Sequence, residues 1–189
     1  MNVDSVNLAT REVRVIGKGS KERVALIGES AKDALSAYMS EVRPEVASID
    51  ADGALFVNRY GKRLSQRSIQ KSIEDALQKL AQELGLEVEF FQSNHEGKIV
   101  DFIQGAADGA DGLVVNAGAL THYGLSLRDA LTDSRLPIVE VHLSNIHARD
   151  EFRRHSVIAD LAVGQIAGLG WRGYKYALDF LAEHLGGRS

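Results

Sequence analysis

An apolar run at residues 137–141 ends directly in a segment rich in histidine and arginine. Such a run, without polar alternation, is typical of a parallel strand that is covered on both faces. The segment that follows, residues 142–155, holds three of the six histidines and three arginines. Ligands of open α/β sheets bind just beyond the carboxyl ends of the strands. This stretch therefore predicts a parallel sheet and an active site suited to proton transfer on an anionic substrate.

The C-terminal part of the chain repeats this strand-to-helix pattern. The predicted strands are residues 87–91, 112–115, 138–142 and 163–167. The predicted helices end near Ile103, near Leu131 and, for the last one, cover residues 173–185. Regular alternation indicates an α/β fold of flavodoxin-like layout, with a parallel sheet, helices on both faces and right-handed crossovers.

The N-terminal part follows a different pattern. Two alternating stretches, residues 11–16 and 22–27, flank a turn at residues 17–20 and predict a β-hairpin. Ser30 can cap a helix that runs to about Val42 and stops near Pro44. The N-terminal part is therefore expected to be a hairpin-and-helix appendage to the parallel sheet.

Two further elements are predicted before the parallel sheet begins. Residues 54–58 are a short apolar strand candidate. Ser68 begins a long amphipathic helix that ends at Gly85.

Composition limits the classes of function. Hydrophobic residues make up 44% and charged residues 25%, as in an ordinary soluble protein. With no cysteine there is neither a thiolate nucleophile nor a cysteine metal site. No apolar run reaches membrane-spanning length and no leader is recognisable, so we expect a cytoplasmic protein without a membrane partner.

Charge divides the chain into two parts. Residues 1–71 hold 12 Lys and Arg against 9 Asp and Glu, whereas residues 72–189 hold 10 against 17. A change of sign between halves can mark pieces of different origin. We therefore expect two domains, residues 1–71 and 72–189, with residues 53–58 as a candidate first strand of the sheet. The acidic part is a poor candidate for nucleic-acid binding, so no nucleic-acid partner is expected.

Five ordered segments from about residue 73 to residue 188 resemble type II 3-dehydroquinate dehydratases. They are FQSNHEG (91–97), NAGALTH (116–122), LRDA (127–130), EVHLSNIHAR (140–149) and GLG (168–170). The resemblance implies a hydro-lyase of the shikimate pathway, which leads to the aromatic amino acids. Such an enzyme removes water from 3-dehydroquinate through an enolate and gives 3-dehydroshikimate. It also implies that no cofactor is needed and that trimers assemble into dodecamers.

The same resemblance assigns the site. His142 matches the general acid, and Glu140 lies two residues earlier on the same strand face, where its carboxylate can orient the imidazole. The other matching residues would contact the substrate: Asn116, His122, Leu143 and Ser144 (through backbone N–H groups), Arg153, and Asp129 from a neighbouring subunit. Tyr174 is interpreted as a packing residue. His95 and Glu96 lack a third ligand at suitable spacing, so no metal site is expected.

The first part of the chain resembles another family. Residues 13–23, 54–58 and 61–65 are similar to the β-hairpin region of Xer-type tyrosine recombinases. Lys18 would be the hairpin lysine of that family. The downstream His-x-x-Arg element and the tyrosine nucleophile are absent from the chain, so we expect no DNA strand cleavage.

The dehydratase resemblance lacks its beginning. Members of that family start with an apolar strand ending in Asn-Gly-Pro-Asn, followed by a lid with an arginine and the catalytic tyrosine. Residues 54–61 again give an apolar strand, Asn, Arg and Tyr-Gly, which makes Tyr60 the candidate surrogate base. We therefore expect activity far below that of the family unless Tyr60 substitutes for the lid tyrosine.

Two alternatives stay open at this point. One is a fusion product that binds ligand or assembles without turnover. The other is a DNA-associated module that uses the basic hairpin around Lys18, Lys21 and Arg23.

Overall fold

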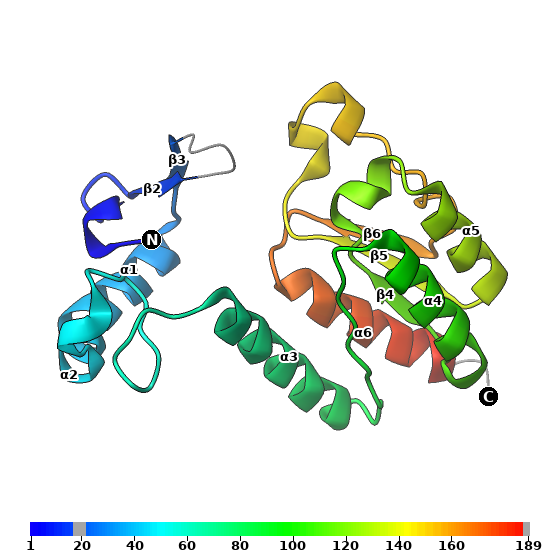
Figure 1. The fold of residues 1–189 in the computed structure, drawn as a ribbon, viewed down its shortest axis with the longest axis horizontal. Coiled ribbons are helices and arrows are strands. Elements are labelled where there is room, and N and C mark those ends of the chain that lie inside the picture. The colour runs from blue at the N-terminus through cyan, green and yellow to red at the C-terminus, as the bar shows by residue number, and fades with distance from the viewer. Residues whose placement is uncertain (17–21, 187–189) are drawn as a thin grey trace. The chain divides into compact units, whose positions relative to one another are not determined.

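The computed structural model describes residues 1–16 and 22–186 and divides the chain into two compact units, Met1–Ser72 and Ile73–Ser189 (Figure 1). The predicted hairpin turn at residues 17–20, with Lys18, lies outside the described residues, as does Lys21. No helix of the described part is both long and apolar enough to span a bilayer.

The first unit contains a small antiparallel sheet. Its strands are β1 (Val6–Asn7), β2 (Glu12–Ile16) and β3 (Glu22–Leu26), in the order β1-β2-β3. The register sets Val13 opposite Ala25, and of the residues of β2 and β3 only Val13 is buried. The two predicted hairpin strands are therefore confirmed, but most residues of the sheet are exposed.

The helical part of the first unit differs from the expectation in two ways. Helix α1 (Glu29–Ala37) starts after Gly28 and not at Ser30. It continues through a π-helical turn (Tyr38–Val42) into α2 (Arg43–Val46), so Pro44 does not end the helix. Pro44 lies in the first turn of α2, where a proline ring fits and its missing N–H costs little.

The predicted strand at residues 54–58 forms only isolated bridges. Ala54 pairs with Asn2, and Val57 pairs with Arg63. Leu55 N–H donates to the Met1 carbonyl at 3.2 Å, and both Ala54 and Leu55 are fully buried. This segment thus makes its backbone hydrogen bonds within the first unit.

Helix α3 (Gln66–Glu83) begins two residues before the predicted start, in the first unit, and continues into the second. It ends as the sequence indicated, at a glycine in the left-handed region. Gly85 has a φ of 71°, and Leu86 N–H donates to the Ala81 carbonyl at 2.8 Å, which satisfies one of the last carbonyls of the helix.

The second unit is an α/β structure with a parallel sheet. The strands β4 (Leu113–Val115), β5 (Ile138–His142) and β6 (Gly164–Ala167) lie in the order β4-β5-β6. Helices α4 (Glu96–Ala106) and α5 (Leu125–Ser134) lie on one face of the sheet, and α6 (Arg172–Gly186) lies on the other (Figure 1). The predicted fold class is confirmed.

Strand β5 is the centre of the core. All five of its residues are buried, and they alternate between the two faces of the sheet. Ile138 packs with Leu127 and Leu131 of α5, whereas Val139 and Val141 pack with Ala177 and Leu181 of α6. Glu140 and His142 share the face of Ile138, so two polar side chains are carried into a buried layer.

The predicted strand at residues 87–91 is not formed. Residues 86–92 have no regular secondary structure, and within the described residues β5 is the sole strand paired with β4. A strand needs a neighbour for its backbone groups, and no described strand pairs with β4 on its other side. Phe91 is instead held by its ring, which stacks on Phe102 of α4 with centroids 4.3 Å apart.

Candidate active site

A cavity of about 230 Å³ opens in the second unit where β4 and β5 end. It brings together six of the nine residues that the sequence assigned to the site: Asn116, His122, His142, Leu143, Ser144 and Arg153. Gly118, Ala119, Ile146 and Arg149 complete its lining. The carboxyl ends of parallel strands meet at one edge of a sheet, and this topology gathers residues that lie far apart in the sequence.

His142 and Glu140 form a buried pair at this edge. His142 Nε2 donates to Glu140 Oε1 at 2.8 Å, and the two residues are 4% and 0% exposed. Because Glu140 lies behind the lining and His142 lies in it, the carboxylate supports the imidazole from inside the protein.

Two further donors bind the Glu140 carboxylate. Ser156 Oγ donates to Oε1 at 2.8 Å, and Gln165 Nε2 donates to Oε2 at 2.7 Å. Burial raises the pKa of Glu140, but the hydrogen bonds from His142, Ser156 and Gln165 outweigh it and hold the pKa below its ordinary value. Glu140 is therefore a carboxylate near neutral pH, although it is buried. The sequence assignment missed Ser156 and Gln165.

Asn116 is oriented by Tyr174, which the sequence led us to interpret as a packing residue. Its side-chain Nδ2 donates to the Tyr174 hydroxyl at 2.6 Å, and its Oδ1 accepts the Gly118 N–H at 3.3 Å. Gly118 has a φ of 58°, which a residue with a Cβ adopts at a cost. Tyr174 lies on α6, 58 residues along the chain, so only the fold reveals this contact.

His122 is fixed in one tautomer by the backbone. Its Nδ1 lies 2.7 Å from the His155 carbonyl oxygen, which can only accept, so Nδ1 carries a proton. A neutral His122 ring then presents Nε2 as an acceptor. A hydroxyl group of a ligand is a suitable partner for it.

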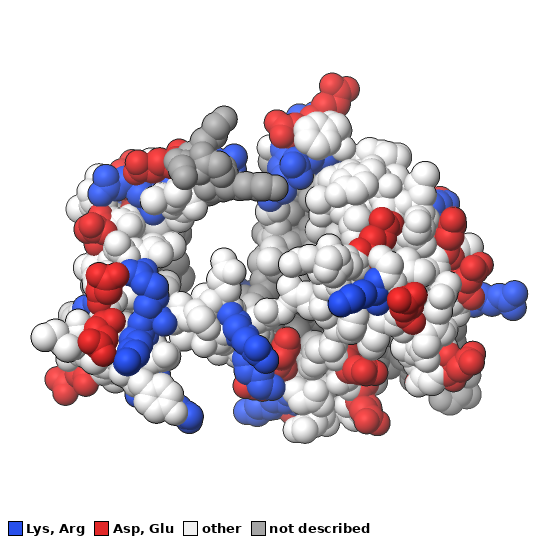
Figure 2. Space-filling view, viewed as in Figure 1, with Lys and Arg blue, Asp and Glu red and all other residues white. Residues whose placement is uncertain are grey.

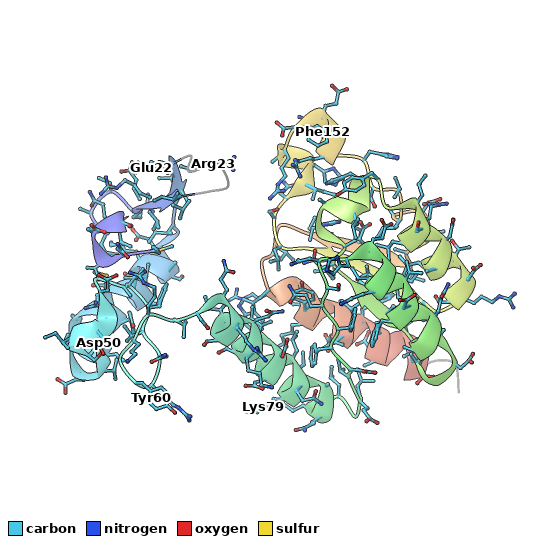
Figure 3. All side chains as sticks on the ribbon, in the orientation of Figure 1. Glu22, Arg23, Asp50, Tyr60, Lys79 and Phe152 are labelled. Carbon is cyan, nitrogen blue, oxygen red and sulfur yellow. The ribbon has the colours of Figure 1, made fainter. Side chains whose placement is uncertain are left out.

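The loop after β5 supplies positive charge. Arg149 and Arg153 line the cavity, and none of the described lining residues is a carboxylate. Arg153 Nε lies 3.7 Å from Asp150 Oδ2, and its guanidinium packs over the Phe152 ring, which is labelled in Figure 3. Figure 2 shows both basic and acidic side chains at this end of the unit. Such a lining suits an anionic ligand.

Two predicted site residues lie elsewhere. Asp129 is exposed on α5, outside the lining of this cavity. Tyr60 belongs to the first unit, is 65% exposed and accepts a hydrogen bond from Arg59 Nη2 at 2.6 Å (labelled in Figure 3). The roles of Asp129 across a subunit interface and of Tyr60 as a base stay predictions.

Glu96, which with His95 could have suggested a metal site, instead accepts a backbone hydrogen bond. Glu96 Oε1 accepts the N–H of Leu127 at 3.2 Å, in the first turn of α5. Across residues 1–16 and 22–186, no three His, Asp or Glu side chains are grouped as metal ligands.

Comparison with known proteins identifies the family. A family model described as "Dehydroquinase class II" matches residues 56–182, well over half of the chain. The chain belongs to the class II dehydroquinase family. The family match includes Tyr60 and extends into α6, up to residue 182.

Individual dehydroquinases agree with this assignment. The 3-dehydroquinate dehydratase of Herpetosiphon aurantiacus is 57% identical over 99 residues, which are 52% of this chain and 69% of that protein. The one of Bacillus subtilis is 53% identical over 106 residues, or 56% of this chain and 72% of that protein. The crystal structure of type II dehydroquinase from Propionibacterium acnes matches 60% of this chain and 83% of its own, with 42% identity and a TM-score of 0.58.

The N-terminal part matches a second family. The model of the phage integrase family covers residues 1–95, so by its first half the chain also belongs to that family. The two matches overlap at residues 56–95, which include α3. The predicted pair of resemblances is therefore confirmed.

Proposed function

We propose that the chain is a 3-dehydroquinate dehydratase whose acid and substrate-binding residues are in place but whose rate is low. The buried His142–Glu140 pair at an arginine-lined cavity is the observation that carries this proposal. The dehydroquinase family match over residues 56–182 supports it. The reaction removes water from 3-dehydroquinate and gives 3-dehydroshikimate.

The substrate is a carboxylate that also bears hydroxyl groups and a ketone. Its carboxylate would accept hydrogen bonds from the backbone N–H groups of Leu143 and Ser144, near the positive charge of Arg149. Asn116 and Arg153 would donate to ring hydroxyls, and His122 Nε2 would accept from one. The cavity is lined by all of these residues, which supports one binding site for the whole molecule.

Elimination then needs one proton removed from carbon and one delivered to oxygen. A base takes a proton from the carbon next to the ketone, and the resulting enolate expels the hydroxyl group. His142, as an imidazolium, would give its Nδ1 proton to the leaving hydroxyl, because Nε2 is already bonded to Glu140. The proton balance closes when the base releases its proton to solvent and His142 takes one up from it.

The base is the weak part of the machinery. Tyr60 is our candidate, and the family match supports it because it includes residues 59–61. A misplacement of about 1 Å can cost about a hundredfold in rate. We therefore expect slow turnover, which the growth of enone absorbance on 3-dehydroquinate would measure.

Three variants separate the roles of these residues. Tyr60→Phe should remove most of the remaining turnover if Tyr60 is the base, and His142→Gln should abolish it. Tyr38→Phe, which also removes one tyrosine hydroxyl from the first unit, is the matched control and should leave the rate unchanged. A rate equal to that of full-length relatives, and insensitive to Tyr60→Phe, would contradict the proposal.

Binding without turnover is the second candidate function. The segment at residues 86–92, which has no regular secondary structure, favours it, because the family strand that should lie beside that segment has no counterpart in the described sheet. Calorimetry with 3-dehydroquinate distinguishes the two candidates. Heat of binding with no enone formed supports the second, and absence of both contradicts each of them.

We further propose a cytoplasmic homo-oligomer, a trimer or a dodecamer, with neither nucleic acid nor membrane as a partner. Exposed Asp129 on α5 is available to a neighbouring subunit. Light scattering after size exclusion measures the assembly. A monomer, or salt-dependent retention of DNA by the chain, would contradict this part of the proposal.

A further inference from the structure

The Glu140 carboxylate is held by three donors and not by His142 alone. Oε1 accepts from His142 Nε2 and from Ser156 Oγ, both at 2.8 Å, and Oε2 accepts from Gln165 Nε2 at 2.7 Å. Glu140 is completely buried. A buried carboxylate oxygen without a partner is costly, so each of these donors restricts where the carboxylate can lie.

Backbone geometry directs two of the donors. The Ser156 hydroxyl oxygen accepts the Ile158 N–H at 3.2 Å, which leaves its own proton for Glu140. Gln165 stands directly opposite Glu140 in the β5–β6 register. Gln165 as a whole is exposed, yet its side-chain amide reaches the buried Oε2 of Glu140. Strand pairing, rather than burial, therefore places this donor.

Ser156 also lies at the end of the loop that follows β5 and carries Arg149 and Arg153. The backbone carbonyl of the preceding residue, His155, accepts a hydrogen bond from His122 Nδ1, and the N–H of the following residue, Val157, donates to the Thr121 carbonyl at 2.8 Å. The loop that carries Arg153 is thus anchored beside the Glu140 carboxylate.

We infer that Ser156 and Gln165 are positioning residues, which hold the Glu140 carboxylate so that neutral His142 keeps its proton on Nε2 and turns Nδ1 to the cavity. Ionised Glu140 can only accept, so His142 Nε2 must be the donor of their bond. Loss of the other two donors frees the carboxylate to rotate, and the imidazole loses its fixed tautomer. The catalytic part of this inference rests on the proposed function, whereas the tautomer itself does not.

Nitrogen-15 NMR of the histidine rings tests the inference without any need for turnover. In its neutral form, His142 should show only the Nε2–H tautomer. The His142→Gln variant assigns its signals among the six histidines. A wild-type His142 that carries its proton on Nδ1 would overturn the inference.

The variants remove one donor at a time. Ser156→Ala and Gln165→Leu should each give His142 a measurable fraction of the Nδ1–H form. The double variant should show a mixture of the Nδ1–H and Nε2–H forms. Ser156→Thr keeps the hydroxyl and should restore the single form. Ser134→Ala removes a serine hydrogen bond of 2.7 Å to the Leu131 carbonyl on α5 and is the matched control, with an unchanged His142 spectrum.

Each outcome is decisive. Folded variants with the wild-type tautomer overturn the positioning role. If Ser156→Ala does not fold, Gln165→Leu, at the exposed residue of β6, still tests the inference. Any measurable turnover should fall about tenfold or more in kcat with little change in KM, since the altered groups do not touch substrate. Absence of turnover in every form would contradict the proposed function and leave the tautomer result intact.

Discussion

The two units use apolar residues in opposite ways. In the second unit, β5 is buried along its whole length between α5 on one face and α6 on the other. In the first unit, β3 is exposed at every position, and Leu26 is 78% exposed. A strand forms in both places, from an apolar run in β5 and from an alternating stretch in β3, but a strand becomes part of a core only where another element covers its face.

Polar groups divide in the same way. The second unit buries Glu140 and satisfies its carboxylate with three donors. The ion pairs of the first unit, such as Lys62 with Asp50 at 3.3 Å, lie in water, where such pairs contribute little. The second unit thus has the enclosed, low-dielectric setting in which a general acid can be held, and the first unit has none among its described residues.

The largest expected effect comes from equal truncations in the two units. Leu127→Ala removes a fully buried side chain from the second unit and should cost about 2–5 kcal/mol of unfolding free energy. Leu26→Ala in the first unit should change it by less than about 0.5 kcal/mol. Urea unfolding followed by Trp171, the single tryptophan, reports on the second unit. Amide hydrogen exchange reports on the first.

Equal costs would contradict the comparison. A large loss of unfolding free energy in Leu26→Ala would mean that another surface covers β3 in solution, although the strand is exposed in the structure. A small loss in Leu127→Ala would mean that the α5 side of the sheet is loosely packed.

Acid sharpens the contrast between buried and exposed carboxylates. The pKa of Glu140 is below its ordinary value in the folded state, because its hydrogen bonds outweigh the effect of burial. Its stabilising contribution is therefore complete above the unfolded pKa of about 4.3 and is lost as the pH falls through the lower, folded pKa. Urea unfolding between about pH 3 and pH 7 should show this loss.

Glu140→Gln should remove that part of the acid dependence and cost about 1–3 kcal/mol at neutral pH, since the buried donors lose their charged acceptor. Asp50→Asn in the first unit is the matched change and should leave the pH profile as it was. An unchanged profile in Glu140→Gln would show that Glu140 is not ionised when folded.

The sequence predicted those elements whose signal is local. Strand β5 occupies the predicted residues, and Gly85 ends α3 because a left-handed residue is needed there. The strand expected at residues 87–91 failed because pairing depends on a neighbour that periodicity does not reveal. Ser30 and Pro44 were misread because the helix begins at Glu29, after Gly28, and because a helix tolerates proline in a first turn.

The site shows the same limit. His142, Asn116 and His122 follow from motifs at strand ends. Gln165 becomes recognisable only from the β5–β6 register, and Tyr174 only from its contact with Asn116 across 58 residues. Sequence motifs thus identify the residues that face the ligand. The side chains that hydrogen-bond to those residues and orient them are identified only from the fold.

Two tyrosine hydroxyls give the last and smallest contrast. Tyr174 accepts from Asn116 Nδ2 at 2.6 Å in the second unit, and Tyr38 accepts from Val57 N–H at 3.3 Å in the first. Tyr174→Phe should leave the Asn116 amide free to rotate and weaken binding of 3-dehydroquinate about fivefold to tenfold, which corresponds to about 1 kcal/mol. Tyr38→Phe should leave that affinity unchanged while costing a similar amount of stability. Calorimetry with the substrate and urea unfolding measure the two quantities. Equal affinities in the two variants would mean that Tyr174 packs against β5 without orienting Asn116, and the second unit would then hold its ligand through the strand ends alone.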